Sequence, residues 1–502
     1  MSERAPSIPR RPEAVWPVVV VGAGFAGLAT ALRLAELGKR VLLLEALNYP
    51  GGCASTFERG GYRFESGATL FAGLAPEQLF GRWIRQHSLD VHVDWLDPVL
   101  ELRTPDLELP VGARRAQLIE RFCELPDAPA AGIREFFAYQ ESLAAPLWSA
   151  LESRRLLSSF GPAALFELAG RAPGLLPVLP LMGKPLGAVL ERFGLARFEP
   201  LRHYLDALCQ ITVQCSSAEA EAPFALSAID YPWRGTGHVR GGIGRLAEGL
   251  LDALRRAGGE VRLAHRVRGL ERVGRRWRLT TARAAFEAER VVANLLPQNL
   301  RELLGDEVRR PDALAKAADD VAGGWGACML YRAATPPSGA PPRPKHLELV
   351  DDPTQPFVEG NHVFVSISGP HDGPRAPEGQ RTLTVSTHID LAALLALPEA
   401  ERGPKVAEVQ ERMRRTIARR APEWDAGTTH ELTASPRTFE RFTGRREGWV
   451  GGIPRRAGLH HYTSFFPPRW APRLHAIGDS AFPGQSILAT ATGGVKLAER
   501  LA

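Results

Sequence analysis

The sequence predicts an α/β protein of two interleaved domains, and three observations carry this prediction. A strand, a glycine loop, a helix and a second strand begin the chain, a strand followed by a helix ends it, and a related block lies near the middle of its 502 residues. Parallel strands need crossover connections, so such units collect in one sheet. We therefore expect a Rossmann-like domain, a parallel sheet with a small β-meander, formed by residues 14–72, 235–300 and 466–502. An α+β domain should comprise residues 73–234 and 301–465.

The composition is that of an ordinary folded protein, with 44% hydrophobic and 24% charged residues. It excludes disorder, collagen and coiled coil as descriptions of the whole chain. The net charge of +6 includes no run of five or six basic residues. We therefore expect no nucleic-acid partner, whereas an anionic membrane surface is compatible with this charge.

The five cysteines are scattered and form no Cys-x-x-Cys pair. We expect no metal site, no disulfide framework and a cytoplasmic location. No clean apolar stretch of 18 residues occurs, so no transmembrane helix is expected. Arg10 and Arg11 precede the apolar run Val18–Val21 as in an export signal, but this run enters a glycine loop and is better interpreted as a strand.

The first strand, Val18–Val21, is β-branched throughout, which is typical of a strand buried on both faces. It enters a Gly-x-Gly-x-x-Gly loop and then a helix with an apolar face. In such a loop Gly22 permits the tight turn, Gly24 lets the backbone approach a diphosphate, and Gly27 lets helix and strand pack closely. Glu45 ends the next strand and is placed to accept hydrogen bonds from a ribose. The pattern predicts dinucleotide binding.

The middle block, residues 235–300, repeats this character. An amphipathic helix follows Gly241–Gly244, and a strand follows it at Val261–Leu263. Three alternating runs then predict an antiparallel meander: Arg266–Val273, Trp277–Thr281 and Ala285–Ala288. A separate short run, Val291–Asn294, ends the block.

Two further features favour FAD over NAD. The doublet Gly51-Gly52 follows the second strand and gives another close backbone approach. Near the end of the chain a strand, Leu474–Ile477, leads to Asp479, and residues 483–501 are predicted to form a helix. Such an aspartate can hold a ribityl hydroxyl, and the helix N-terminus can stabilise negative charge on a reduced flavin.

Together, the Gly22–Gly27 loop, Glu45, Gly51-Gly52 and Gly478-Asp479 resemble the FAD-dependent amine oxidase and carotenoid desaturase superfamily. The stretch Pro50–Ala72 is similar to the carotenoid desaturase and isomerase branch.

Two other stretches refine this resemblance. Gly478–Gln485 is similar to the same branch, and Val363–Gly369 most resembles carotenoid 3,4-desaturases. Two positions depart from many relatives: Cys53 stands where they carry arginine, which removes a cation near the flavin, and Glu65 stands where they carry aspartate.

The resemblance implies one noncovalent FAD, and that the strand around Val267 offers backbone groups to the adenine. The expected cofactor-binding residues are Gly22, Gly24, Phe25, Ala26, Gly27, Glu45, Ala46, Gly52, Cys53, Gly67, Ala68, Thr69, Val267, Gly478, Asp479, Ser486 and Ile487.

The resemblance further implies desaturation of a carotenoid or similar apolar polyene, in which flavin N5 accepts a hydride and a neighbouring proton leaves. Glu65, Thr69 and His238 are the candidate bases. Redox-neutral cis–trans isomerisation, or saturation of a double bond by reduced FAD, uses the same pocket and stays open. A flavin-binding protein without catalytic activity is a further alternative.

An amine oxidase is the alternative from another enzyme class. Such relatives often keep a lysine near flavin N5, but the matching strand, Gly326–Tyr331, has none, and Lys316 lies about ten residues earlier. The second nucleotide loop of two-nucleotide flavoenzymes is also missing, since no strand of sufficient length leads into Gly241–Gly244. We therefore expect a quinone or oxygen as electron acceptor.

The second domain contains a leucine-rich, helix-like segment over residues 136–210. Within it Ala172–Gly183 is apolar but carries three prolines and is too short to span a bilayer. It is either a wall of the substrate pocket or a patch that dips into a membrane surface. The second interpretation predicts peripheral membrane association.

Overall fold

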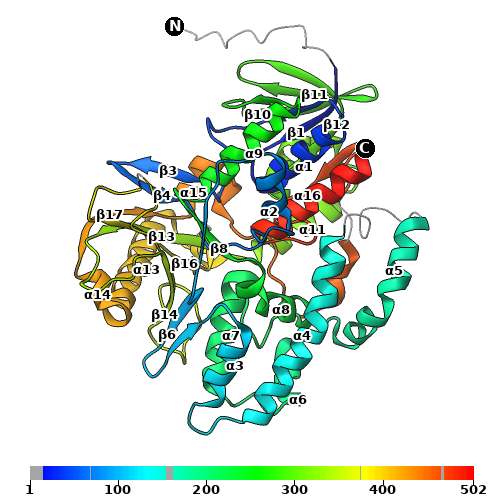
Figure 1. Ribbon diagram of the computed structural model, residues 1–502. Coiled ribbons are helices and arrows are strands. Elements are labelled where there is room, and N and C mark those ends of the chain that lie inside the picture. Colours follow the sequence, from blue (N-terminus) through cyan, green and yellow to red (C-terminus); the bar gives the residue numbers. More distant parts are fainter. Residues whose placement is uncertain (1–14, 68, 154–161, 374, 465–467) are drawn as a thin grey trace.

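The computed structural model describes residues 15–67, 69–153, 162–373, 375–464 and 468–502. Two seven-stranded sheets and a helical region account for most of them. Figure 1 shows the first sheet at the top, the second at the lower left and the helical region at the bottom. The first sheet has parallel strands and a meander, so the predicted α/β fold class is confirmed.

The first sheet assembles strands from both ends and the middle of the chain. Its order is β10 (Val267–Val273), β11 (Arg276–Thr281), β12 (Ala285–Ala293), β1 (Trp16–Val21), β2 (Val41–Leu44) and β9 (Glu260–Arg262), and β18 (Leu474–Ala476) also pairs with β12. Strand β1 pairs in parallel with both β2 and β12, which places the two ends of the chain together.

Strand β12 corrects one expectation. The runs Ala285–Ala288 and Val291–Asn294 were predicted as separate pieces, but they form one strand that ends at Ala293. One edge of this strand pairs antiparallel with β11 and farther along pairs in parallel with β18, while the other edge pairs with β1. The meander therefore continues the parallel sheet.

Helices cover both faces of this sheet. One face packs against α1 (Phe25–Glu36), α9 (Gly244–Arg256) and α16 (Ile487–Leu501). The other packs against α10 (Pro297–Leu304) and α11 (Pro311–Ala322). The structure thus places Leu304 and Leu314, expected in the second domain, against the first sheet, while Val321 at the end of α11 joins the core of the second sheet.

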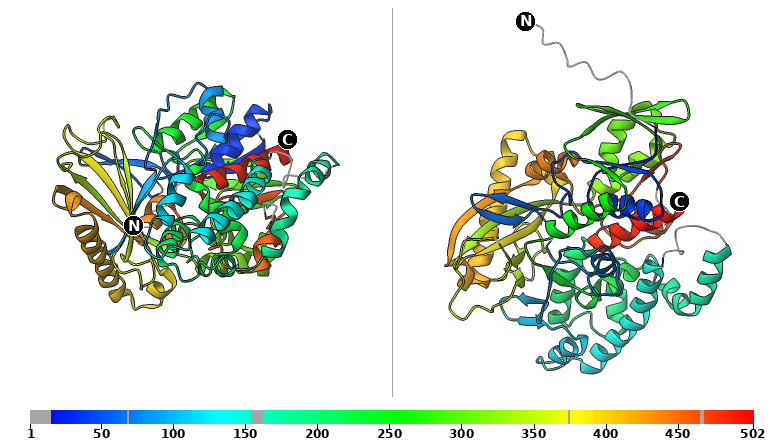
Figure 2. Two further views of the ribbon diagram at one scale, coloured as in Figure 1. Left: turned by 60° about the horizontal axis from the view of Figure 1, so that its bottom comes forward. Right: turned by 45° about the horizontal axis from the view of Figure 1, so that its top comes forward.

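The last helix is shorter than expected. It begins at Ile487, not at Pro483, because Gly484 has φ +85, outside the helical region. The Ser486 hydroxyl accepts a hydrogen bond from Ala489 N at 3.0 Å and so caps the helix. Helices α1 and α16 lie side by side in Figures 1 and 2. A Cβ on Gly494 would lie 2.4 Å from Ala26 O, so the approach requires glycine.

The second sheet joins the two stretches predicted to build the second domain. Its order is β17 (Thr428–Ala434), β13 (Gly326–Ala334), β16 (Arg381–Ile389), β15 (His362–Ile367), β14 (Lys345–Val350), β6 (Leu100–Arg103) and β7 (Glu108–Val111). Helix α13 (Glu399–Arg420) packs on one face.

Shorter elements complete the fold. They are the pairs β3 (Thr56–Arg59) with β4 (Tyr62–Glu65) and β5 (Val93–Trp95) with β8 (Gly237–Val239), and the helices α2 (Leu79–Gln86), α12 (Leu391–Ala396), α14 (Pro422–Asp425) and α15 (Pro436–Thr443).

The helical region contains α3 (Arg115–Cys123), α4 (Ala130–Glu152), α5 (Pro162–Leu175), α6 (Leu186–Arg192), α7 (Glu199–Thr212) and α8 (Ala222–Ile229). Helix α5 stands at the edge of the molecule and runs into a 3₁₀ helix, Leu176–Leu181. Among the described helices none is long and apolar enough to cross a membrane.

Candidate functional site

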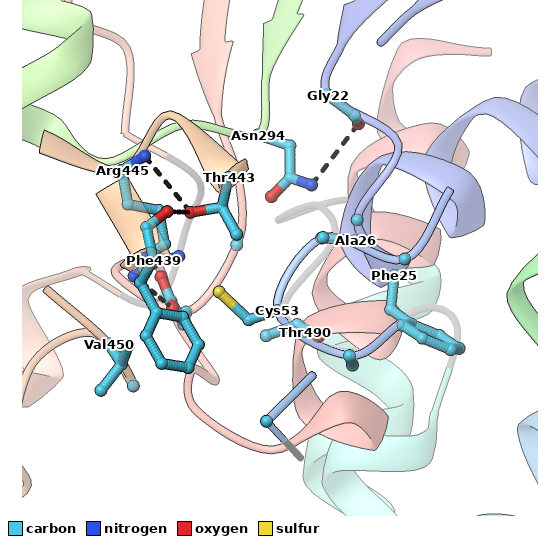
Figure 3. Close-up of a pocket in the computed structure, with 18 of the residues that line it drawn as sticks. Gly22, Phe25, Ala26, Cys53, Asn294, Phe439, Thr443, Arg445, Val450 and Thr490 are labelled. Carbon is cyan, nitrogen blue, oxygen red and sulfur yellow. Dashed lines mark hydrogen bonds and ion pairs between the residues drawn. The ribbon is translucent and has the colours of Figure 1, made fainter. Parts of the chain in front are cut away.

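One cavity of about 850 Å³ extends from the carboxyl ends of the first sheet's parallel strands to the face of the second sheet. Figure 3 shows its centre, where Cys53 lies between the glycine loop around Gly22 on one side and Thr443 and Phe439 on the other. Ligands of open parallel sheets bind at this end of the strands.

The glycine loop has the geometry of a diphosphate cradle. Gly22 has φ +97, which favours glycine, and its N–H donates to Leu44 O at 2.7 Å. A Cβ on Gly27 would lie 1.9 Å from Gly22 O, so only glycine fits there. Helix α1 begins directly after Gly24, and its first N–H groups have no intrahelical acceptor. The loop therefore presents backbone donors and a positive helix end to an anion.

Glu45 is buried beside this loop. Its two carboxylate oxygens accept hydrogen bonds from Ala23 N at 2.6 Å and Leu47 N at 2.8 Å. Burial raises the pKa of Glu45, and the two backbone hydrogen bonds oppose that shift. Because each oxygen has a second lone pair and the residue lines the cavity, Glu45 can also accept a ribose hydroxyl.

The glycine doublet lies against the first glycine loop. Gly51 N donates to Ala23 O at 2.9 Å, and a Cβ on Gly52 would lie 3.6 Å from the Gly24 Cα. Asp479 and the N-terminus of α16 line the same part of the cavity. The acid and the helix N-terminus that the sequence suggested for a ribityl chain and a flavin therefore both face the cavity.

The residues present fit FAD. Thr69 lines the cavity, and its buried hydroxyl has no hydrogen-bond partner among the described residues, as expected of a group that contacts a ligand. Fifteen of the expected cofactor-binding residues line the cavity: Gly22, Gly24, Phe25, Ala26, Glu45, Ala46, Gly52, Cys53, Gly67, Thr69, Val267, Gly478, Asp479, Ser486 and Ile487. Gly27 lies behind the lining, in its packing role, and Ala68 lies outside the described residues.

Beyond this cradle the cavity continues into a chamber with many apolar side chains. They come from α7, the second sheet, α15 and the segment that follows α15, and include Ile211, Met329, Phe364, Phe439 and Val450. Such a wall suits an apolar ligand and excludes water.

Gln214 is a fixed polar group in this chamber. It is buried, and its Oε1 has no hydrogen-bond partner among the described residues. Its φ of +61 is strained for a non-glycine residue, and Trp325 Nε1 holds its carbonyl at 2.8 Å. A Cβ on Gly451 would lie 1.3 Å from Gln214 Nε2, so this glycine makes room for the amide.

His388 also lines the chamber, and its Nδ1 lies 3.2 Å from Gln210 Nε2. Burial lowers the pKa of His388 to about 4. The imidazole is therefore neutral at neutral pH. Because an amide nitrogen only donates, Nδ1 accepts from Gln210 and Nε2 carries the ring proton.

Two of the three candidate bases do not face the cavity. His238 Nε2 lies 2.7 Å from Asp372 Oδ2, and both side chains are almost fully buried. Glu65 Oε1 accepts from Ile243 N at 3.1 Å, and its Oε2 lies 3.6 Å from Arg375 Nη1. These contacts hold both side chains in a buried cluster outside the lining, so of the three candidates only Thr69 is placed to contact a ligand.

Several lining residues were not expected from the sequence. Asn294 donates to Gly22 O at 3.5 Å, and its position directly after a buried strand could have revealed it. Gln214, His388 and Arg445 have no such local signal, because tertiary contacts alone bring them to the cavity.

Comparison with known proteins supports FAD as the cofactor. The sequence pattern of the family described as flavin containing amine oxidoreductase matches residues 25–436. The chain is 24% identical to the chloroplastic prolycopene isomerase of Arabidopsis thaliana over 98% of its own length and 83% of that protein.

Two relatives match shorter parts. The human all-trans-retinol 13,14-reductase is 29% identical over 49% of this chain and 40% of that protein. The phytoene desaturase (neurosporene-forming) of Cereibacter sphaeroides is 37% identical over 18% of this chain and 17% of that protein.

Proposed function

The chain belongs to the flavin containing amine oxidoreductase family and is an FAD-dependent oxidoreductase, and from this premise we propose that it desaturates a carotenoid or a similar apolar polyene. The observation that carries the proposal is the continuous cavity, in which a dinucleotide cradle opens into a chamber with apolar walls. The names of the three relatives refer to isomerisation, reduction and desaturation. We infer that this chain shares a pocket suited to the double bonds of an apolar chain.

In this proposal FAD supplies the acceptor for the hydride that leaves an allylic carbon. Gly24 and Gly52 admit the diphosphate, and Phe364 and Phe439 align the polyene and exclude water. Conjugation stabilises the positive charge that develops on the substrate, so alignment in a dry chamber matters more than a strong base. The neighbouring proton can leave to solvent through the Thr69 hydroxyl, which accepts it while giving up its own.

Isomerisation is the second candidate, and the match to prolycopene isomerase over nearly the whole chain favours it. It requires the same cradle and chamber but no net electron acceptor. An amine oxidase is less well supported. Strand β13 contains no lysine, and Lys316 on α11 is exposed and paired with Asp320 at 2.8 Å.

The proposal includes the membrane as the source of the insoluble substrate. Four apolar side chains at the edge of the molecule have exposed fractions between 45% and 83%: Phe166, Leu168, Leu176 and Leu179. They belong to α5 and to the 3₁₀ helix that follows it, which include most of Ala172–Gly183. We infer that this apolar edge touches a lipid surface.

Expression in a host that makes carotenoids, followed by pigment analysis, tests the function. We expect products with longer conjugation and a red-shifted absorption. A host with unchanged pigments, although the protein is purified with FAD bound, would contradict action on carotenoids.

A further inference from the structure

Arg445 follows α15 and lines the cavity on the side opposite Gly22 of the glycine loop (Figure 3). Its guanidinium is held at two points: Nε donates to Trp449 O, and Nη2 lies 2.7 Å from Asp479 Oδ2. Among the described residues its Nη1 has no hydrogen-bond partner. The side chain is thus a fixed cation with unused donors at the cavity.

Cys53 links Arg445 to the diphosphate cradle. It directly follows the Gly51-Gly52 doublet, and Gly51 forms a bridge with Gly24 of the first loop. Burial raises the pKa of the Cys53 thiol, and the nearby positive charge of Arg445 opposes this shift. Position 53 and the guanidinium therefore share one environment beside the helix end that receives the diphosphate.

The other arginines in the lining are less suited to this place. Arg446 is half-exposed and pairs with Glu302 at 2.8 Å, and Arg268 is exposed. Arg266 lies beside Gly444, and its positive charge lowers the pKa of Glu45 at the ribose end of the cradle. Arg445 is the lining arginine in the described chain that combines an ion pair to Asp479 with proximity to Cys53.

We propose that Arg445 binds the FAD diphosphate and supplies the positive charge that position 53 lacks in this chain. Nη1 would donate to a diphosphate oxygen, while the ion pair with Asp479 keeps the guanidinium in place. The positive charge beside the diphosphate thus comes from the residue after α15 instead of from the residue after the glycine doublet.

The test is ligand binding to apoprotein, measured apart from catalysis. FAD is titrated by flavin fluorescence, and ADP and adenosine are tested as competitors. We expect Arg445→Gln to weaken FAD and ADP binding about 10- to 100-fold, the loss of one charge-assisted hydrogen bond, and to leave adenosine binding unchanged. The control is Arg441→Gln, an exposed arginine of α15 outside the lining, which should bind all three ligands as wild type does.

Two further variants separate the alternatives. If Arg445 merely neutralises Asp479, then Arg445→Gln with Asp479→Asn will bind ADP as wild type does, and the proposal is wrong. If the cation itself matters, this double variant stays weak, whereas Cys53→Arg with Arg445→Gln recovers ADP binding. The double variant Cys53→Arg/Arg445→Gln must first unfold at the wild-type temperature. If it does and still binds ADP no better than Arg445→Gln, then an arginine at position 53 cannot replace Arg445, and that part of the proposal is wrong. Unchanged ADP affinity in Arg445→Gln would overturn the proposal as a whole.

Discussion

A Cβ on Gly24 would lie 2.8 Å from Asn294 Nδ2, so a side chain there would displace that amide. Gly24→Val should therefore abolish FAD binding, because its methyl groups also occupy the diphosphate space. Purified protein should lack the flavin absorption that heat or acid releases from wild type. Gly269→Val on strand β10 is the control, because a Cβ there makes ordinary contact with Thr280. Stoichiometric flavin in Gly24→Val would refute the assigned cradle.

Asp372 stabilises the fold through the buried cluster behind the cavity. Burial alone would raise its pKa, but His238 and Arg375 lower the pKa to about 2, below the 3.8 of a free side chain. A depressed carboxyl pKa adds stability above pH 3.8 that is lost as the pH falls toward 2.

Asp372→Asn should consequently lower the free energy of unfolding by about 2–4 kcal/mol near neutral pH, and by less near pH 3. Urea unfolding of both proteins across this range measures the difference. If the two proteins differ in free energy of unfolding by the same amount near neutral pH and near pH 3, the charge of Asp372 is not the cause of the lost stability.

Single residues show where sequence reasoning succeeds and where it stops. Gly22 and Asp479 were predicted because a loop or a strand end fixes their place locally. Glu65 was misjudged as a base, since its orientation depends on Arg375, about 300 positions away in the chain. Contacts with Trp325 and Gly451 place Gln214 in the chamber, and no local sequence pattern predicts these contacts.

At the scale of elements, periodicity predicted most strands and helices, and the errors lie at junctions. Strand β12 looked like two pieces because Glu289 and Arg290 interrupt its apolar pattern. Both are exposed, while Val291 and Val292 enter the core, so one strand passes from the meander into the buried sheet. The start of α16 was placed too early because the φ of Gly484 is not visible in a sequence.

The prediction of peripheral membrane association rests on the 3₁₀ helix after α5. Leu176 and Leu179 are 58% and 56% exposed. Replacing both with serine should reduce recovery of the protein with floating anionic liposomes, because apolar burial supplies much of interfacial binding. High salt should release only part of the wild-type protein. The control is Val273→Ser, since Val273 is 39% exposed on β10, away from α5. Equal flotation of the leucine variant and wild type would show that this 3₁₀ helix has no membrane role.

For the whole molecule, the interleaved chain explains how one cavity serves two tasks. The glycine loop and the last helix both belong to the first sheet's domain, whereas the chamber walls come largely from the second sheet and α7. Each domain therefore contributes one half of the site. Most residues that the sequence predicted for the cofactor half line the cavity, because their motifs are local. The chamber is lined by side chains that are far apart in the sequence and meet only in the folded chain.

This arrangement also predicts the fate of the electrons. The described chain has one glycine-loop nucleotide cradle, and the chamber is the apolar part of the same cavity. We therefore expect a quinone or oxygen that enters the chamber to accept the electrons, and NAD, for which the described residues form no second cradle, not to accept them. We expect protein in liposomes to red-shift the absorption of a less conjugated carotenoid when a quinone is supplied, and NAD to give no turnover. The rate should depend on the quinone concentration, because each new double bond releases two electrons. If the absorption shifts only slightly, and reduced flavin is required without net use of an acceptor, the protein is an isomerase and the proposed desaturation is wrong.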